Sequence, residues 1–194
     1  MSVAPIPQPA SPLIVSGEMR IRPLVEADLP VLTSWLADER VLEFYEGRDT
    51  TWPPQRVREH FLDAPDYDAE FLRVIIEWRG EAIGYGQVYR LYGELFDEYG
   101  LQNTGAVVYA MDQFIGVPEL WNQGLGSAYV ASIVDFLAAD RGATTVVVDP
   151  RTENPRAVRC YQKAGFEFVK LLPAHELHEG ELRDCWLMRR ELGG

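Results

Sequence analysis

A run of apolar residues at 105–116, "GAVVYAMDQFIG", constrains the fold more than any other part of the sequence. A strand with one face in water alternates apolar and polar side chains, whereas a strand covered on both faces is apolar nearly throughout. The run therefore predicts a long central strand with cover on both sides. A helix is predicted soon after it, because apolar residues recur at helical spacing at Leu125, Tyr129, Ile133, Phe136 and Leu137.

The segments around this pair of elements predict an α/β fold. Runs rich in β-branched and aromatic residues are typical of strands, and apolar residues at helical spacing are typical of helices. Strands are expected at residues 19–24, 143–150, 166–172 and 181–192 and in a hairpin at 70–92, and helices at 26–38, 52–63 and 154–165. Residues 93–104 and 173–180 are expected to be loops. This order predicts a mixed central sheet of about six or seven strands with helices on both faces.

The length of 194 residues suits one well-buried domain. Residues 1–18 contain four prolines and no basic start, so we expect a flexible Pro-rich leader rather than a signal helix. Residues 19–194 are expected to form the single domain. No stretch of the sequence is both long enough and apolar enough to predict a membrane-spanning helix.

The formal net charge of −12 argues against a nucleic-acid or anionic-membrane partner, since both require a basic surface. Cationic small molecules suit such a chain better. The two cysteines, Cys160 and Cys185, form no CxxC pair, which favours a reducing, cytoplasmic compartment. His175 and His178 are three residues apart, whereas a zinc-binding His-Glu-x-x-His motif needs four, so no metal is expected.

Two glycines, Gly124 and Gly126, stand where the long helix begins. The first N–H groups of a helix have no partner within it, and glycine lets an anion approach them closely. The dinucleotide-binding fingerprint is excluded because Tyr129 occupies its third glycine position, and the Gly-Lys-Ser/Thr of a Walker loop is absent. The pattern indicates either a phosphate-binding turn or a helix that simply begins with a tight turn.

The order of elements and this turn resemble the GCN5-related N-acetyltransferase (GNAT) fold, in which a Q/R-x-x-G-x-G/A turn holds the pyrophosphate of acetyl-CoA. Trp121 stands where that pattern has Gln or Arg, and Gln123 is a candidate replacement donor. The segment "NPRAVRCYQKAGF" is also similar to a family signature, matching it at Asn154, Ala157, Tyr161, Lys163, Gly165 and Phe166.

Four further segments narrow the resemblance: "WLADERVLEFYEGRD", "FLRVIIEWRGEAIGYGQVYRLYGELFDEY", "VYAMDQFIGVPELWNQGLG" and "LPAHELHEG". They are similar to the aminoglycoside 6′-N-acetyltransferases, and in particular to the acetyltransferase half of the bifunctional acetyltransferase–phosphotransferase resistance enzyme. The resemblance covers about Met19 to Met188. It implies acetyl transfer from acetyl-CoA, without a metal, to the 6′-amine of kanamycin-, tobramycin- or gentamicin-type antibiotics, by a monomer or homodimer.

The resemblance also implies which residues contact acetyl-CoA. Asn154 has two compatible interpretations, as the N-cap of its helix and as a contact of the pantetheine arm. The implied cofactor-binding residues are Phe114, Ile115, Gln123, Gly124, Leu125, Gly126, Ser127, Asn154, Ala157 and Tyr161.

Asp112 interrupts the apolar run, and a buried carboxylate is costly unless it has a partner. It is either a structural carboxylate at a strand irregularity or the base that takes a proton from the amine, which is the role that the resemblance implies. Tyr161 is either a packing residue or, by resemblance, the acid that protonates the departing thiolate. Together they predict direct transfer without a covalent enzyme intermediate.

Further acidic and aromatic residues are candidates for binding the acceptor. Asp149 follows a predicted buried strand and is either a turn residue before Pro150 or a second acceptor carboxylate. Besides Asp112 and Asp149, the candidates are Glu43, Tyr45, Glu94, Asp97 and Glu98, for which a solvated surface position is the alternative. Two other functions stay open: acetylation of another small polyamine or siderophore-type amine, and a non-catalytic module that binds acyl-CoA or aminoglycoside.

Overall fold

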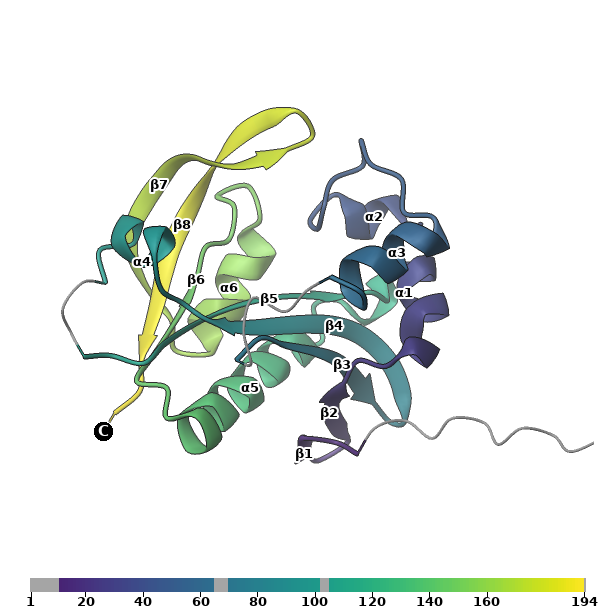
Figure 1. Ribbon diagram of the computed structural model, residues 1–194, viewed down its shortest axis with the longest axis horizontal. Helices are drawn as coiled ribbons and strands as arrows, with labels where there is room; N and C mark the ends of the chain where they lie inside the picture. The colour runs from purple at the N-terminus through teal and green to yellow at the C-terminus, as the bar shows by residue number, and fades with distance from the viewer. Residues whose placement is uncertain (1–10, 65–69, 102–104, 194) are drawn as a thin grey trace, which may run out of the picture.

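The computed structural model describes residues 11–64, 70–101 and 105–193 (Figure 1). These residues form one sheet of eight strands in the order β1-β2-β3-β4-β5-β6-β8-β7. The strands are β1 (Ile14–Ser16), β2 (Met19–Pro23), β3 (Leu72–Trp78), β4 (Glu81–Arg90), β5 (Val108–Ile115), β6 (Thr145–Val148), β7 (Glu167–His178) and β8 (Glu181–Glu191). The helices are α1 (Leu29–Trp35), α2 (Glu39–Leu42), α3 (Pro54–Phe61), α4 (Glu94–Glu98), α5 (Leu125–Arg141) and α6 (Pro155–Lys163), with short 3-10 turns η1 (Glu26–Asp28) and η2 (Pro118–Leu120).

Helices cover both faces of the sheet, as the apolar central strand predicted (Figure 1). Alternate residues of β3 show the two faces: Val74 and Ile76 pack into the core beneath α5 and α6, whereas Ile75 packs into the core beneath α1, α2 and α3. All three side chains are fully buried. The predicted α/β class and the arrangement of helices on both faces are therefore confirmed.

The sheet opens between β5 and β6, its one parallel pair among the described strands. The pairing covers Val108↔Thr145, Tyr109↔Val146 and Ala110↔Val147 and then stops. β5 continues to Ile115 with β4 as its partner on the other side. Crevices beyond the carboxyl ends of parallel strands are the usual ligand sites of α/β sheets. The sequence places Asp112 just beyond the last pair on β5 and Asp149 directly after β6.

The strand count is eight, slightly above the expected six or seven, because β1 lies within the segment expected to be a leader. Leu13 donates its backbone N–H to the carbonyl of Ile21 at 2.8 Å, and Ile14 packs against the main core. Burial of Ile14 and pairing with β2 therefore attach residues 14–16 to the sheet. The expected leader is wrong for this part, and residues 1–10 lie outside the described residues.

Two expected loops contain regular structure. The acidic segment at 93–104 includes the short helix α4, which begins after Gly93 at a φ of 73°. Residues 173–178 continue β7 rather than forming a loop, and their pairing with β8 shifts register between Leu172 and Glu176. Pro173 cannot donate to a strand ladder, so the irregularity takes it out of the regular pairing.

No helix in the described part of the chain has the length and apolar character needed to cross a membrane.

We predict that Gly86→Ala destabilises the protein by about 1–3 kcal/mol, because overpacking forces a core to rearrange. A Cβ at Gly86 would collide with the hydroxyl of Tyr129, which is fully buried and has no hydrogen-bond partner among the described residues. Adding Tyr129→Phe should recover part of the loss, since it removes the oxygen that Cβ meets. Urea unfolding of the two single variants and the double variant measures this coupling. Strictly additive effects would contradict it.

Candidate active site at the opening between β5 and β6

A cleft of about 220 Å³ lies between the end of β5, the glycine turn before α5, and α6. Val41 of α2 and Phe44 form part of its wall. Of the residues predicted to contact acetyl-CoA, those on the cleft are Phe114, Ile115, Gly124, Leu125, Gly126, Ser127, Asn154 and Ala157. The structure therefore gathers onto one cleft residues from three elements that are distant in the sequence.

The glycine turn leaves the start of α5 accessible. Gly124 caps the helix with a φ of 85°, a left-handed conformation that favours glycine. Apart from its chain neighbours and the backbone of its own helix, a Cβ added at Gly126 would have only the Sγ of Cys160 within 4 Å, at 3.4 Å. The unpaired N–H groups of the first turn and the positive end of the helix dipole thus form one side of the cleft. On the facing helix, the side chain of Asn154 caps α6 by accepting from the N–H of Ala157 at 3.1 Å.

Trp121 and Gln123 are both held by backbone carbonyls. The indole Nε1 of Trp121 donates to the carbonyl of Ile115 at 2.7 Å, and the amide of Gln123 donates to the carbonyl of Glu119 at 2.8 Å. Gln123 does not line the cleft. Its amide satisfies the end of η2, and its contact with the cofactor stays a prediction.

The cleft is basic although the chain is strongly acidic. Its described lining contains Arg156, Arg159 and Lys163 and no Asp or Glu. It also contains Gln113, whose Oε1 is buried without a hydrogen-bond partner in the described part of the chain. A basic, acid-free cleft beside a free helix N-terminus suits an anionic ligand. The sequence analysis missed Gln113, although a polar residue in an apolar run was a signal that it shared with Asp112.

Asp112 lies beside Gln113 on β5, and successive strand residues point to opposite faces. Its Oδ2 accepts from the amide of Gln87, its cross-strand partner on β4, at 2.8 Å. Burial raises the pKa of Asp112 to about 6, and the negative charges of Asp149 and Glu176 add to the rise. Hydrogen bonds from Gln87 and Tyr89 lower the pKa and so oppose it. A carboxyl group with this pKa is suited to accepting a proton near neutral pH.

Asp149 is held by two side chains from other elements. The hydroxyl of Tyr99 donates to its Oδ2 at 2.8 Å, and Nε2 of His175 lies 3.1 Å from the same oxygen. Nδ1 of His175 lies 3.0 Å from an oxygen of Glu98 on α4. The hydrogen bond to Asp149, more than any other interaction, raises the pKa of His175. Asp149 is thus fixed in position beside the opening, and the sequence analysis had not assigned roles to Tyr99 or His175.

Tyr161 lies on α6 but does not line the cleft. Its ring packs against Phe166 with the ring centres 5.5 Å apart, and the residue is buried. Burial raises the pKa of Tyr161 well above its ordinary value, and the negative charges of Asp112 and Asp149 contribute. The hydroxyl is therefore protonated at neutral pH, as a general acid must be. The ring of Tyr161 is buried and the residue is not among those that line this cleft, so its contact with the cofactor and its role as the acid stay predictions.

The remaining acceptor candidates are dispersed. The ring of Tyr45 packs on Phe114 with the centres 4.5 Å apart. Glu94 and Asp97 lie exposed on α4, whereas Glu98 of the same helix reaches His175. The structure thus brings Asp112 and Asp149 together and leaves Glu94 and Asp97 at the surface of α4.

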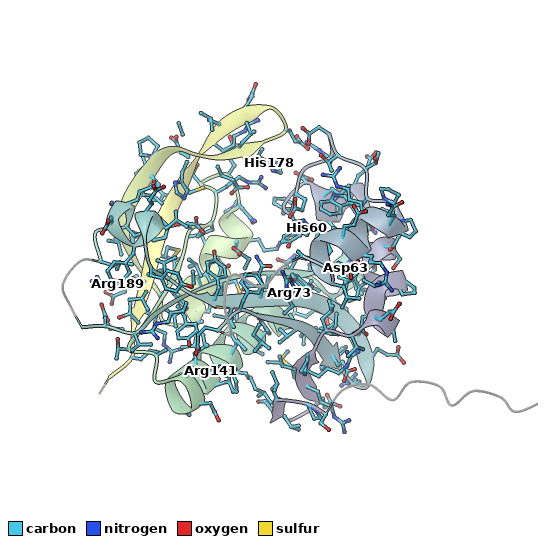
Figure 2. All side chains as sticks on the ribbon, in the orientation of Figure 1. His60, Asp63, Arg73, Arg141, His178 and Arg189 are labelled. Atoms are coloured by element: carbon cyan, nitrogen blue, oxygen red, sulfur yellow. The ribbon has the colours of Figure 1, made fainter. Side chains whose placement is uncertain are left out.

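Polar contacts cross the opening and join its two sides. A guanidinium nitrogen of Arg151 donates to the carbonyl of Glu43 at 2.9 Å. Farther out, Nε of Arg48 donates to Glu179 at 2.6 Å. Figure 2 shows His178 on the β7–β8 side of this crossing and His60 on the α3 side. These contacts therefore connect the segment after α2 to the β7–β8 hairpin.

No group of three or more His, Cys, Asp or Glu side chains in the described ranges is arranged to hold a metal ion.

Comparison with known proteins agrees with this arrangement. Residues 24–173 match the acetyltransferase (GNAT) domain family, so the chain belongs to the GNAT acetyltransferases. It is 32% identical over 152 residues to the aminoglycoside N(6′)-acetyltransferases type 1 of Klebsiella pneumoniae and Serratia marcescens, covering 78% of this chain and 75% of each relative. A solved structure of AAC(6′)-Ib with ribostamycin and coenzyme A is similar at 25% identity, with a TM-score of 0.70, covering 90% of this chain and 93% of that one.

A second solved structure, aminoglycoside acetyltransferase AAC(6′)-Ib with coenzyme A and kanamycin, is similar at 25% identity and a TM-score of 0.69, over 89% of this chain and 94% of that one. The spermidine N-acetyltransferase of Vibrio cholerae shares the fold at a TM-score of 0.72 but only 16% identity. The family that the sequence motifs predicted is thus confirmed.

We predict that acetyl transfer loses kcat/KM as the pH falls through about 6. The pKa of Asp112 is raised to about 6, so its carboxylate form is present above that pH and is lost below it. Removing the charge of Asp149 should lower this pKa, so the acid limb of Asp149→Asn should move to lower pH. Gln87→Leu removes a hydrogen bond that lowers the pKa and should move the limb upward. Carboxyl NMR titration of the free protein, with the pH profile of kcat/KM, measures both shifts, and identical limbs in all three proteins would contradict the assignment.

Proposed function

We propose that this protein transfers the acetyl group of acetyl-CoA to the 6′-amine of aminoglycoside antibiotics of the kanamycin, tobramycin and gentamicin type, and so confers resistance to them. The observation that carries this proposal is Asp112, a carboxyl group with a pKa of about 6 at the opening of the sheet. Gln113, the next residue along β5, lines a basic cleft for the donor, and the charge of Asp149 acts on Asp112. The similarity to aminoglycoside N(6′)-acetyltransferases supports the choice of acceptor.

In this scheme the anionic donor and the polycationic acceptor bind in different places. The anionic donor lies along the acid-free cleft, with its phosphates at the start of α5 and its thioester toward the opening. The polycationic acceptor is drawn to the carboxylates on the other side. Asp149, held by Tyr99 and His175, orients an ammonium group of the acceptor. The reacting atoms then meet where β5 and β6 no longer pair.

Chemistry follows by direct transfer. Asp112 accepts a proton from the 6′-ammonium group, and the freed amine attacks the carbonyl carbon of the thioester. A carbon–nitrogen bond forms, the carbon–sulfur bond breaks, and the nitrogen gives up its remaining extra proton to water. Tyr161, which burial keeps protonated, donates a proton to the departing thiolate. Water then returns a proton to Tyr161 after it has acted, and Asp112 releases its proton to the solvent, so that one proton is released in each cycle. The products are the 6′-N-acetyl aminoglycoside and free coenzyme A, and no covalent enzyme intermediate is required.

Two alternatives are separated from this proposal by simple assays. Acetylation of spermidine or a siderophore-type amine with no turnover of kanamycin would favour another small-amine acetyltransferase. Tight binding of coenzyme A or kanamycin without turnover would favour a non-catalytic module. Both cysteines are free, which supports a cytoplasmic location, and either a monomer or a homodimer is compatible with the proposal.

We predict that Asp112→Asn lowers kcat/KM for kanamycin by ~10²–10⁴-fold, the usual contribution of a general base. Binding of coenzyme A should change little, because Asp112 does not line the donor cleft. Release of coenzyme A, measured with kanamycin and with an analogue that carries a 6′-hydroxyl, tests the base and the position of transfer together. Asp135→Asn, on an exposed part of α5, is the matched control for loss of one carboxylate. Activity of Asp112→Asn within about twofold of the wild type, or transfer to the 6′-hydroxyl analogue, would overturn the assignment.

A further inference from the structure

Arg156 differs from the two buried arginines, Arg22 and Arg151, in how its charge is accommodated. Arg22 pairs with Asp28 at 2.7 Å, and Arg151 pairs with Glu176 at 3.3 Å. The guanidinium of Arg156, by contrast, makes no ion pair with any carboxylate in the described part of the chain. Arg156 is half-buried at the start of α6 and lines the basic cleft.

Two aromatic rings hold the Arg156 guanidinium in place. Its central carbon lies 3.8 Å from the ring centre of Trp121 and 4.5 Å from that of Phe44. Trp121 is itself fixed by the hydrogen bond from its indole to Ile115. A salt bridge between Arg40 of α2 and Glu119 of η2, at 3.0 Å, joins the segments that carry the two rings. The planar cation is therefore oriented before any ligand arrives.

The energetic balance of this position indicates a missing anion. Burial is the largest effect on Arg156 and lowers its pKa. The negative charge of Glu43 raises the pKa and so opposes burial, and the positive charge of Arg159 lowers it. Stacking on aromatic rings compensates only part of the cost of desolvating a cation. An apolar side chain would fill the space between two rings without that cost. A cation kept here, in a cleft whose described lining has no acid, is suited to binding an anionic group of a ligand.

The position of Arg156 along the cleft indicates which anionic group of the ligand it binds. Trp121, on which Arg156 stacks, lies three residues before Gly124 at the turn that opens α5. Arg159 and Lys163 follow Arg156 on the same face of α6, at spacings of three and seven residues. Of these three cations, Arg156 is the one that stacks on a residue of the glycine turn. The free N–H groups of that turn are suited to binding phosphate oxygens.

We propose that Arg156 is the side chain that binds the pyrophosphate of acetyl-CoA, and that Trp121 and Phe44 orient it for this task. The proposal rests on acetyl-CoA being the donor in the function proposed above. The guanidinium fork offers paired N–H donors that match phosphate oxygens, whereas a lysine ammonium offers only a point charge. The side-chain contact to the pyrophosphate thus comes from α6, while the turn itself supplies backbone N–H groups.

The test measures binding of coenzyme A and of dephospho-coenzyme A by calorimetry, which requires no acceptor. Arg156→Gln should weaken both ligands by about 10- to 100-fold, the range expected for hydrogen bonds to a charged group. The effects should be equal, because both ligands contain the pyrophosphate. Arg156→Lys should recover only part of the affinity. Arg189→Gln, on β8 near the C-terminal end of the chain (Figure 2), removes one positive charge elsewhere and should leave both affinities unchanged.

A truncated donor separates a phosphate contact from a structural role. Acetyl-pantetheine lacks the pyrophosphate, so its kcat/KM with kanamycin should be the same in the wild type and in Arg156→Gln. An equal loss with acetyl-pantetheine would show that Arg156 supports the fold of the cleft instead. A loss with coenzyme A but not with dephospho-coenzyme A would assign Arg156 to the 3′-phosphate, and unchanged binding of both would leave it without a role; each result overturns the proposal. If the wild type binds coenzyme A but does not acetylate kanamycin, the proposed acceptor fails while the calorimetric test of Arg156 still holds.

Discussion

The end of pairing between β5 and β6, after Ala110 and Val147, is the constraint on which the site depends. A strand that is apolar on both faces has to be covered by helices, and that cover places α5 and α6 on one side of the opening. The same break leaves Asp112 of β5 without a β6 partner beside it. Because β5 and β6 are parallel, their carboxyl ends meet at one place, and the chemistry-bearing residues of both strands meet there too.

The separation of charge across this opening explains how a chain of net charge −12 can use an anionic donor. On the side of α5 and α6, backbone N–H groups and the cations of α6 line a cleft whose described residues include no acid. On the other side, burial raises the pKa of Asp112, and repulsion from Asp149 and Glu176 adds to the rise. In the proposed scheme an incoming ammonium group relieves that repulsion, so the acceptor binds where its proton is to be removed.

Sequence patterns predicted the elements and the local motifs well, because these depend on neighbouring residues. The glycine turn, the Asn154 cap and the family all followed from short segments of sequence. Contacts between distant segments could not be predicted in this way: Tyr99 and His175 reach Asp149 only because α4 and β7 fold against β6. The sequence likewise does not show that the amide of Gln123 turns to the carbonyl of Glu119.

The central claim, that donor and acceptor meet at Asp112 from opposite sides of the opening, is tested most directly by a crystal structure with coenzyme A and kanamycin bound together. The account predicts that the 6′-nitrogen lies within hydrogen-bond reach of the Asp112 carboxylate, about 2.6–3.2 Å or through one water. It also predicts that the nitrogen lies near the coenzyme sulfur, with the pyrophosphate at the start of α5. A 6′-nitrogen bound at Asp149, with Asp112 out of reach even through one water, would contradict it.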